Sequence, residues 1–441
     1  MHARDQFRRV TLPAALTLAL GALIGTTMTG GASAATSGGE AAEAYDLVVR
    51  NGHVIDPKNH VDAVRDVAIK DGKIAKVAER IDASAAKKTV DASGEYVTPG
   101  LIDLHAHLFP GPEDAYKNGW AGVAPDGFTF RSGVTTAVDT GSSGARSFDL
   151  FKKNVIDRSK TRVLAFLNIV GEGMAGGDYE SDLGDMDPDM AAAKAKENPD
   201  TIVGIKTAHF TGPEWTAVEN SVKAGEEADI PVMVDFGNNR PQRPLEQLLT
   251  EKLRPGDIYT HAYSGLRGEL GKDGKLNPGM WKGRERGVLF DVGHGGGSFG
   301  WDVAIPAVEQ GFLPDTISTD LHIDSMNSGM KDQSNVMSKM LTLRMPLKDV
   351  VNASTWASAK AIQRPELGNL SVGAPADLAV FTLEKGKFGF VDSFGWRVDG
   401  NRKLSAEVTV RAGKVVWDLN GQAAQKYTPA ASRFTASTDE H

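Results

Sequence analysis

Residues that could bind a metal ion stand at the ends of short apolar stretches in this sequence. His105 and His107 close the stretch that begins at residue 100, and they are two positions apart, so on a strand both imidazoles point to the same side. Such a pair can hold one metal ion, although a lone His-x-His also fits two partly buried histidines. Asp320 ends another apolar stretch, where a carboxylate is costly unless it binds metal or is well hydrogen-bonded. The pattern indicates metal chemistry.

A lysine in a similar position gives two interpretations. Lys206 ends an apolar stretch, and a buried ammonium is also costly. It could pair with a carboxylate such as Asp235, which ends the next stretch. Alternatively, CO2 could convert it to a carbamate, a bidentate anion able to bridge two metal ions. His261 ends a further stretch and His294 lies just past another, so six stretches end in residues able to act as ligands. That number would be a large coincidence for purely structural residues.

The elements that must position these residues follow from the central pattern. Eight short apolar stretches alternate with segments that are mostly long enough for a helix and its loops: 100–104, 134–138, 163–169, 202–205, 231–234, 257–260, 288–292 and 316–319. Residues 215–228 have the apolar spacing of a helix. The alternation predicts an α/β protein with a (β/α)8 TIM barrel, whose active site lies where the carboxyl ends of the strands converge. A doubly wound open sheet is the alternative, but no glycine-rich nucleotide loop supports it.

Both ends of the chain have a different, β-rich pattern. Residues 45–56 are typical of a strand, an Asn-Gly turn and a second strand, and 67–77 form a similar unit. Residues 376–381 and 408–416 have the same β-strand pattern. We expect one small discontinuous β-sandwich domain built from residues 45–98 and 366–425, with the barrel at 99–365. A linker at 35–44 precedes it and a tail at 426–441 follows.

The first 34 residues are typical of a signal peptide. Arg4, Arg8 and Arg9 precede a mostly apolar run at 12–24, and small residues at 32–34 suit cleavage. The run is shorter than the roughly 20 residues of a membrane-spanning helix, although an uncleaved anchor is the alternative. The two adjacent arginines weakly resemble a twin-arginine signal. We expect an exported protein, secreted or in the cell envelope, without stable membrane insertion after cleavage.

Composition narrows the partners and the ligands. The chain has 441 residues, a formal net charge of -8 and no cysteine. No basic surface favours nucleic acid, so we expect a small-molecule substrate, with a homo-oligomer left open. Without thiolates, any metal must be held by His, Asp, Glu or a modified lysine.

Several motifs together resemble one family. TPGLIDLHAH at 98–107 resembles the first-strand signature of the amidohydrolase superfamily, and DLVVRNGHVID at 46–56 and GAPADL at 373–378 also match. More specific motifs resemble its dihydroorotase-related branch of amidohydrolase/deacetylase metallohydrolases: GIK at 204–206, RPGDIYTH at 254–261, FDVGHG at 290–295 and STDLH at 318–322. The resemblance covers nearly all of the chain after the signal peptide.

The resemblance implies two divalent metal ions, usually zinc. The first would be held by His105, His107 and Asp320, and the carbamate of Lys206, formed from CO2, would bridge to a second ion on His261. The family's fifth strand usually ends in another histidine, where this chain has Asp235. Asp235 can replace that imidazole as a metal ligand, weaken the second site, or leave one metal.

The function that follows is hydrolysis of an amide or ester bond. Metal lowers the pKa of a bound water, and Asp320 would act as the general base and acid. Deacylation of an acylated amino or hydroxy acid is our first expectation, and cyclic amide hydrolysis, as in dihydroorotase, is the second. A non-catalytic scaffold, or a lyase that uses the same metal site, would also fit these residues.

Other residues are candidates for substrate contact. His294, followed by Gly295 to Gly297 and Ser298, is interpreted as a catalytic oxyanion or substrate contact, with a plain loop histidine as the alternative. Arg240 could clamp a substrate carboxylate, or lie on a solvated loop. His209 could touch a carboxylate or the carbamate, or simply begin a surface helix. His322 could hold Asp320 in place.

Overall fold

The computed structural model describes residues 44–111, 121–237 and 240–428. The predicted signal peptide and residues 35–43 of the predicted linker lie outside this range, as do residues 429–441 of the tail. Within the described residues, no helix combines the length and the apolar character that crossing a membrane requires.

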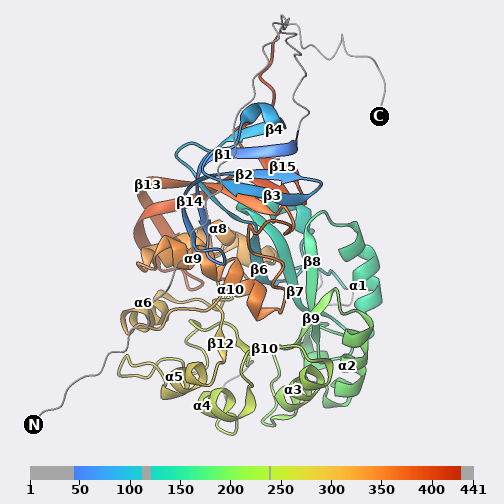
Figure 1. Ribbon diagram of the computed structural model, residues 1–441. Helices are drawn as coiled ribbons and strands as arrows, with labels where there is room; N and C mark the ends of the chain where they lie inside the picture. Colours follow the sequence, from blue (N-terminus) through green and yellow to red (C-terminus); the bar gives the residue numbers. More distant parts are fainter. Residues whose placement is uncertain (1–43, 112–120, 238–239, 429–441) are drawn as a thin grey trace, which may run out of the picture. The chain divides into compact units, whose positions relative to one another are not determined.

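The centre of the chain forms a curled parallel sheet, with every neighbour consecutive in sequence (Figure 1). Its strands are β6 (Leu101–Ala106), β7 (Val134–Gly144), β8 (Arg162–Asn168), β9 (Ile202–Thr207), β10 (Val232–Val234), β11 (Ile258–Tyr259) and β12 (Leu289–Phe290). All residues of β6, β7 and β9 are buried, as expected for strands covered on both faces. Seven of the eight predicted stretches are therefore strands of one parallel sheet.

The eighth stretch, 316–319, is not a regular strand, yet it lies between the two edges of the sheet. Isolated parallel bridges join Thr316 to Asp291, next to β12, and Leu321 to Ala106 in β6. The backbone N–H of Val292 donates to Thr316 O at 3.1 Å, and that of Leu321 donates to His105 O at 3.1 Å. The prediction of a parallel α/β sheet is confirmed, and a regular eighth strand is absent from the described residues.

The helices follow the strands, as the alternation predicts. They are α1 (Phe148–Asn154), α2 (Pro188–Glu197), α3 (Thr216–Ala228), α4 (Leu245–Gln247), α5 (Pro278–Glu285), α6 (Trp301–Glu309), α7 (Ile323–Asn327), α8 (Gln333–Thr342), α9 (Leu347–Ala353) and α10 (Trp356–Ala361). The helix predicted at 215–228 is α3. It buries Ala217, Ser221 and Ala224 on one face and ends at Asp229, whose φ of 54° is left-handed.

The two ends of the chain build a separate mixed sheet, which confirms that they share one β unit. Its strands are β1 (Tyr45–Asp56), β2 (Val61–Lys70), β3 (Lys73–Ala78), β4 (Ala86–Asp91), β5 (Tyr96–Pro99), β13 (Leu378–Val391), β14 (Arg397–Arg411) and β15 (Lys414–Asp418). C-terminal β13 pairs antiparallel with N-terminal β5, so blue and red strands meet in Figure 1. The sheet is one connected unit that branches at β1, which pairs with β2, β4 and β5.

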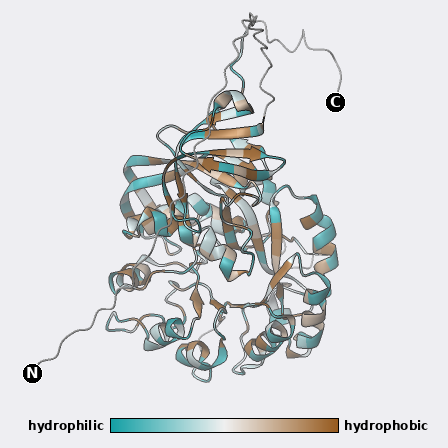
Figure 2. Cartoon of the chain, viewed as in Figure 1, coloured by the Kyte–Doolittle hydropathy of each residue, from teal (hydrophilic) through white to brown (hydrophobic). Residues whose placement is uncertain are grey.

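The mixed sheet has a hydrophobic cluster of its own, and a larger cluster contains residues of both sheets. In the mixed sheet, Val49 and Val67 from the N-terminal part pack in one cluster with Val380 and Val408 from the C-terminal part. Figure 2 shows hydrophobic residues concentrated on the strands and hydrophilic residues on helices such as α1. Helix α8 joins the two regions, because the Ser338 hydroxyl accepts the Leu404 N–H of β14 at 3.0 Å. Burial of these apolar faces fixes the strand ends that carry the polar residues.

Candidate metal centre

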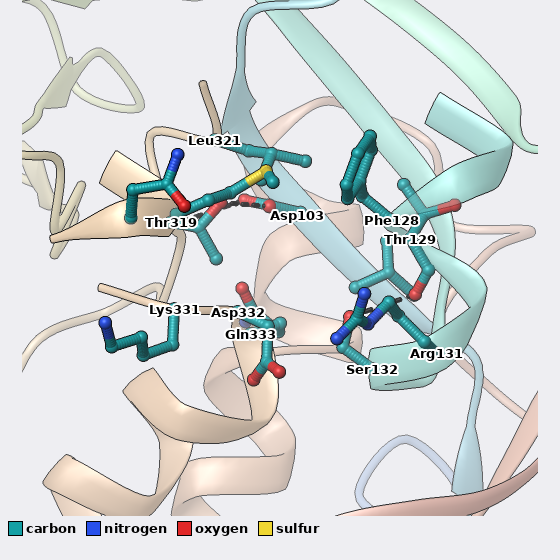
Figure 3. Close-up of a pocket in the computed structure, with 13 residues that line it drawn as sticks. Asp103, Phe128, Thr129, Arg131, Ser132, Thr319, Leu321, Lys331, Asp332 and Gln333 are labelled. Atoms are coloured by element: carbon teal, nitrogen blue, oxygen red, sulfur yellow. Dashed lines mark hydrogen bonds between the residues drawn. The ribbon is translucent and has the colours of Figure 1, made fainter. Parts of the chain in front are cut away.

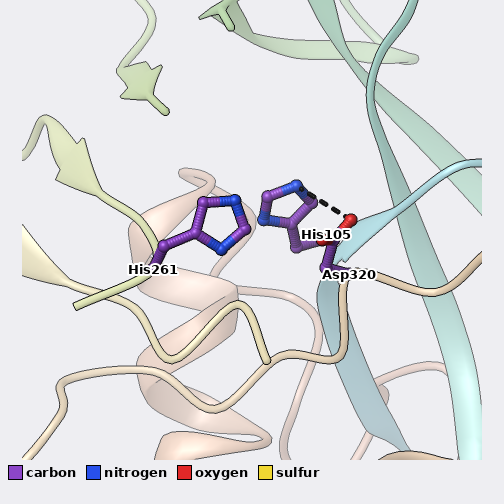
Figure 4. A group of neighbouring side chains, drawn as sticks. All are labelled: His105, His261 and Asp320. Carbon is purple, nitrogen blue, oxygen red and sulfur yellow. Dashed lines mark ion pairs between the residues drawn. The ribbon is translucent and has the colours of Figure 1, made fainter. Parts of the chain in front are cut away.

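Three buried side chains from different strand ends meet at one point (Figure 4). His105 is the penultimate residue of β6, His261 lies just after β11, and Asp320 follows the 316–319 stretch. One ligand atom from each lies within 4.8 Å of the others, and among the described residues this is the one group of three His or acidic side chains so placed. We call these three residues the donor cluster. Parallel strands bring their carboxyl ends to the same edge, which is why distant residues converge here.

A chain of hydrogen bonds fixes the proton on the His105 ring. Asp291, fully buried, accepts the Thr260 hydroxyl proton at 2.8 Å. Thr260 Oγ1 has no second proton, so at its 3.0 Å contact with His105 Nδ1 it must accept. His105 therefore carries its proton on Nδ1 when neutral, and its Nε2 lone pair faces the donor cluster. Burial, followed by the Lys206 charge, holds the His105 pKa well below its usual range, which favours this neutral form.

The ring of His261 is oriented in a similar way. Its Nδ1 lies 2.6 Å from the Gly293 carbonyl, which can only accept, so Nδ1 carries the proton of the neutral ring and Nε2 its lone pair. Glycine is needed here because a Cβ on Gly293 would lie 2.3 Å from Thr260 Oγ1. The backbone of both His261 and Gly293 is left-handed, with φ of 63° and 46°.

Asp320 is surrounded by histidines. Its Oδ1 is 2.9 Å from His107 Nε2 and 3.5 Å from His105 Nε2, and its Oδ2 is 3.9 Å from His322 Nε2. Burial raises the pKa of this carboxyl, but the histidines outweigh burial and the net pKa lies well below the usual value. His322 caps α7 by accepting the Ser325 N–H on Nδ1, which leaves the Nε2 proton facing Asp320. His107, expected on the first ion, reaches the donor cluster through its contact with Asp320.

Lys206 lies beside the donor cluster without a carboxylate partner. It is 1% exposed, and its Nζ is 3.2 Å from His105 Nε2 and 3.6 Å from Met233 Sδ. Burial lowers its pKa. No ion pair joins Lys206 to Asp235 within the described residues, so the interpretation as a simple Lys–Asp pair is not supported. The carbamate on Lys206 stays a prediction.

Asp235 lies outside the donor cluster and has cationic neighbours of its own. Its Oδ1 forms an ion pair with buried Arg267, and its Oδ2 is 3.4 Å from both His261 Nε2 and His209 Nε2. His209 is half exposed and also contacts Glu180 at 2.5 Å. Burial opposes the charge of His209, but Glu180 and Asp235 raise its pKa to about 9. His209 thus touches a carboxylate, rather than beginning a surface helix.

His294 is fully buried, and both its ring nitrogens have partners. Nδ1 donates to Gly295 O at 2.9 Å, and Nε2 accepts from Lys339 Nζ at 2.6 Å. The ring stacks on Phe299, with centroids 4.6 Å apart. No ring nitrogen is left for a ligand in this arrangement, so the catalytic or substrate role of His294 stays a prediction without support from its contacts.

The other two predicted substrate contacts lie nearer the surface. Arg240 is exposed and donates from Nε to the Thr211 carbonyl at 3.0 Å. Ser298 is half-buried and lies close to Asp320, because a Cβ on Gly295 would be 3.6 Å from Ser298 Cβ and 2.5 Å from Asp320 Oδ2. Ser298 therefore lies at the edge of the donor cluster, while Arg240 belongs to the loop after β10.

Reasoning from sequence missed the residues behind the ligands. Thr260 and Asp291 both fall at the ends of predicted strands, and that position was the available signal. Buried Arg267 and Lys339 lie outside the apolar stretches, and no local pattern distinguishes them from surface cations.

A separate cavity of about 260 Å³ lies next to this region (Figure 3). It is lined by Asp103 and Thr319 but by no member of the donor cluster. Asp103 accepts the Thr319 N–H at 3.0 Å, and burial raises the Asp103 pKa to about 7. This hydrogen bond ties β6 to the backbone just before Asp320.

The donor cluster fits a divalent cation. It offers two imidazole nitrogens whose lone pairs are fixed by acceptors behind them, together with one carboxylate, and zinc sites use such ligands.

Comparisons with known proteins show the family of this chain. The family model described as the amidohydrolase family matches residues 298–416. A deacetylase of Brucella anthropi is 33% identical over 384 residues, which are 85% of this chain and 92% of the relative. The crystal structure of an adenine deaminase superposes with a TM-score of 0.78 at 30% identity, covering 85% of this chain and all of that one. The crystal structure of a dihydroorotase gives 0.73 at 32% identity, covering 84% and 99%. The chain belongs to the amidohydrolase superfamily.

Proposed function

We propose that the protein is a metal-dependent hydrolase that cleaves an amide or ester bond of an acylated amino or hydroxy acid. The observation that carries this proposal is the donor cluster, in which His105, His261 and Asp320 converge with their ligand atoms within 4.8 Å. The near full-length similarity to a protein named a deacetylase favours deacylation.

The chemistry assigns a role to each residue. A divalent ion on these ligands lowers the pKa of water and polarises a carbonyl group. His105 and His261 would hold the ion through Nε2, because Thr260 and Gly293 occupy their Nδ1 atoms. Asp320 would take the proton of the attacking water and return it to the leaving nitrogen or oxygen. Ser298, at the edge of the donor cluster, and Arg240 would contact the substrate.

Cyclic amide hydrolysis is the second candidate, favoured by the similarity to a dihydroorotase structure. The predicted export argues against pyrimidine synthesis, which is cytosolic.

The proposal also covers the closure of the barrel and the export of the protein. We propose that the segment 316–321 closes the barrel in the place of an eighth strand, since Thr316 bridges to Asp291 next to β12 and Leu321 bridges to Ala106 in β6. Export after cleavage near residue 34, by the twin-arginine route or another, is also proposed. The mass of the mature protein recovered from its native host tests the cleavage, because retention of residues 1–34 would exclude it. The β-sandwich arrangement, the domain boundaries and a homo-oligomer remain predictions.

The decisive experiment is hydrolysis by metal-reconstituted protein. Asp320→Asn should keep the fold by circular dichroism and lose about 10²–10⁴-fold in kcat on any substrate that the wild type cleaves. The matched control is Asp324→Asn, the same change at an exposed position four residues away. Substrates would be N-acetyl amino acids, O-acetyl hydroxy acids and dihydroorotate. Wild-type turnover by Asp320→Asn would exclude the proton transfer, and cleavage of dihydroorotate alone would favour cyclic amide hydrolysis.

A further inference from the structure

Asp235 differs from the residues of the donor cluster in the charge of the side chain bound to it. Asp235 is 6% exposed and stands where the resemblance places the histidine of a second metal ion. Its Oδ1 is bound to the guanidinium of Arg267, also 6% exposed. A permanent buried cation therefore already lies on the residue that would have to ligate a second cation.

Arg267 is held in this position from several directions. Its NH1 donates to Ser264 Oγ at 3.1 Å, and its backbone N–H donates to Glu269 Oε2 at 2.9 Å. Glu269 is itself fixed by the hydroxyls of Tyr259 and Ser264, at 3.0 and 2.6 Å. Arg267 Nε has no hydrogen-bond partner, and Asp235 is the one carboxylate in an ion pair with the guanidinium within the described residues. The pair is thus mutually dependent, because either charge alone would be buried without compensation.

The position of His261 agrees with a single ion. The resemblance assigns this histidine to the second metal, yet its ligand atom falls within 4.8 Å of those of His105 and Asp320. Asp235, although 3.4 Å from His261 Nε2, completes no such group in the described residues.

We infer that the Arg267 guanidinium takes the place of the second metal ion in this protein, so that the chain binds one divalent ion at the donor cluster. This inference rests on the proposed function, since it presupposes that the donor cluster binds metal. A second ion at Asp235 would face the charge of Arg267 and compete with it for one carboxylate. Lys206 then has no second ion to bridge, and it stays an unmodified amine.

The experiment counts metal ions per chain. Wild type, reconstituted with zinc and bicarbonate and then freed of loose metal, should hold one equivalent by mass spectrometry of metals. Asp235→His combined with Arg267→Met removes both charges together and restores an imidazole, so this double variant should hold two. With ¹³C-bicarbonate, NMR should show a lysine carbamate in the double variant and none in the wild type. Arg158→Met, at an exposed arginine, is the matched control and should hold one.

Each outcome separates the inference from the function. Two equivalents or a carbamate in the wild type would overturn the inference and leave the hydrolase proposal intact. No metal in the wild type would overturn both. One equivalent in a double variant that is folded by circular dichroism would overturn the role of the Asp235–Arg267 pair. If that variant does not fold, Arg267→Lys is measured instead: it keeps the charge and should still hold one equivalent, whereas two would overturn the inference.

Discussion

The donor cluster and the Asp235–Arg267 pair are both buried, and both contain a carboxylate at the carboxyl ends of the central strands. They differ in what lies behind them. Behind His105 stands an anion, Asp291, acting through Thr260, and this leaves the Nε2 lone pair facing inward, where Lys206 Nζ lies 3.2 Å away. Beside Asp235 stands a cation, Arg267, which takes up the carboxylate's charge. The difference teaches that residue type alone does not define a metal ligand, because the charge of the supporting residue decides whether the ligand is available.

His294 resembles Asp235, because a basic side chain also contacts the atom that could bind a metal. Its Nε2 lone pair accepts a hydrogen bond from Lys339 Nζ, just as Asp235 accepts one from Arg267. His294 is therefore a buried imidazole without a free ligand atom, although it lies in the same strand-end loop as Gly293 and Gly295.

Among changes that leave Asp320 itself in place, the largest effect should come from crowding the donor cluster directly. In Gly295→Ala, the new methyl group would lie 2.5 Å from Asp320 Oδ2, at a backbone φ of 57° that alanine rarely adopts. Displacement of Asp320 should lower kcat/KM by about 10²-fold, with the fold retained by circular dichroism. Gly297→Ala, where a Cβ meets nothing within 4 Å, is the control and should keep its activity. Equal activities in the two variants would show that the position of Asp320 does not matter.

A smaller effect should follow from changing the anion behind His105. Asp291 accepts hydroxyl protons from Thr260, Thr316 and Ser318. An asparagine at this position would turn its amide NH2 group, a donor, toward at least one of these three hydroxyls. In Asp291→Asn the Nδ1 proton of His105 loses its support, so zinc affinity should fall by about 10–100-fold. Competition with a chelator measures this affinity, and Asp200→Asn, at an exposed residue, is the control. Unchanged zinc affinity would show that the anion behind His105 does not decide whether this ring binds metal.

The smallest effect concerns pH and stability at Lys339. Burial lowers the Lys339 pKa to about 7, with Asp392 and Asp332 opposing and Lys331 assisting this shift. Between pH 7 and 10 Lys339 holds a proton in the unfolded chain that it lacks in the folded protein, so its contribution to stability rises with pH there. Below pH 7 Lys339 is protonated in both states and this contribution is constant. The gain is at most about 1.4 kcal/mol per pH unit.

Urea unfolding at pH 7.5 and 9.5 measures this slope. Lys339→Met should make the slope less positive by at most about 1.4 kcal/mol per pH unit, because the opposing contribution of His209, whose pKa is about 9, is present in both proteins. Lys348→Met, at an exposed lysine, should have the wild-type slope. If the free energy of unfolding of Lys339→Met changes with pH just as that of the wild type does, Lys339 does not lose its proton on folding.

Much of the framework was predictable from local pattern. Seven of the eight stretches are strands because apolar runs of that length bury well in a parallel sheet, and α3 follows from its helical spacing. The eighth stretch contains three hydroxyl residues and lacks regular pairing; only isolated bridges join this segment to Asp291 next to β12 and, at Leu321, to β6. His105, His261 and Asp320 were identifiable because they end such stretches. Arg267 and Lys339 were not, since a buried cation and a surface cation look alike until the fold is known.

The sequence by itself determined which stretches form strands and which residues stand at the strand ends, because these depend on local hydrophobic periodicity. Only the tertiary structure decided which polar residues have free ligand atoms. Partners such as Asp291 for His105, or Arg267 for Asp235, come from distant parts of the chain. Their charges act through space over a few ångströms in a buried site, and no linear pattern records that proximity.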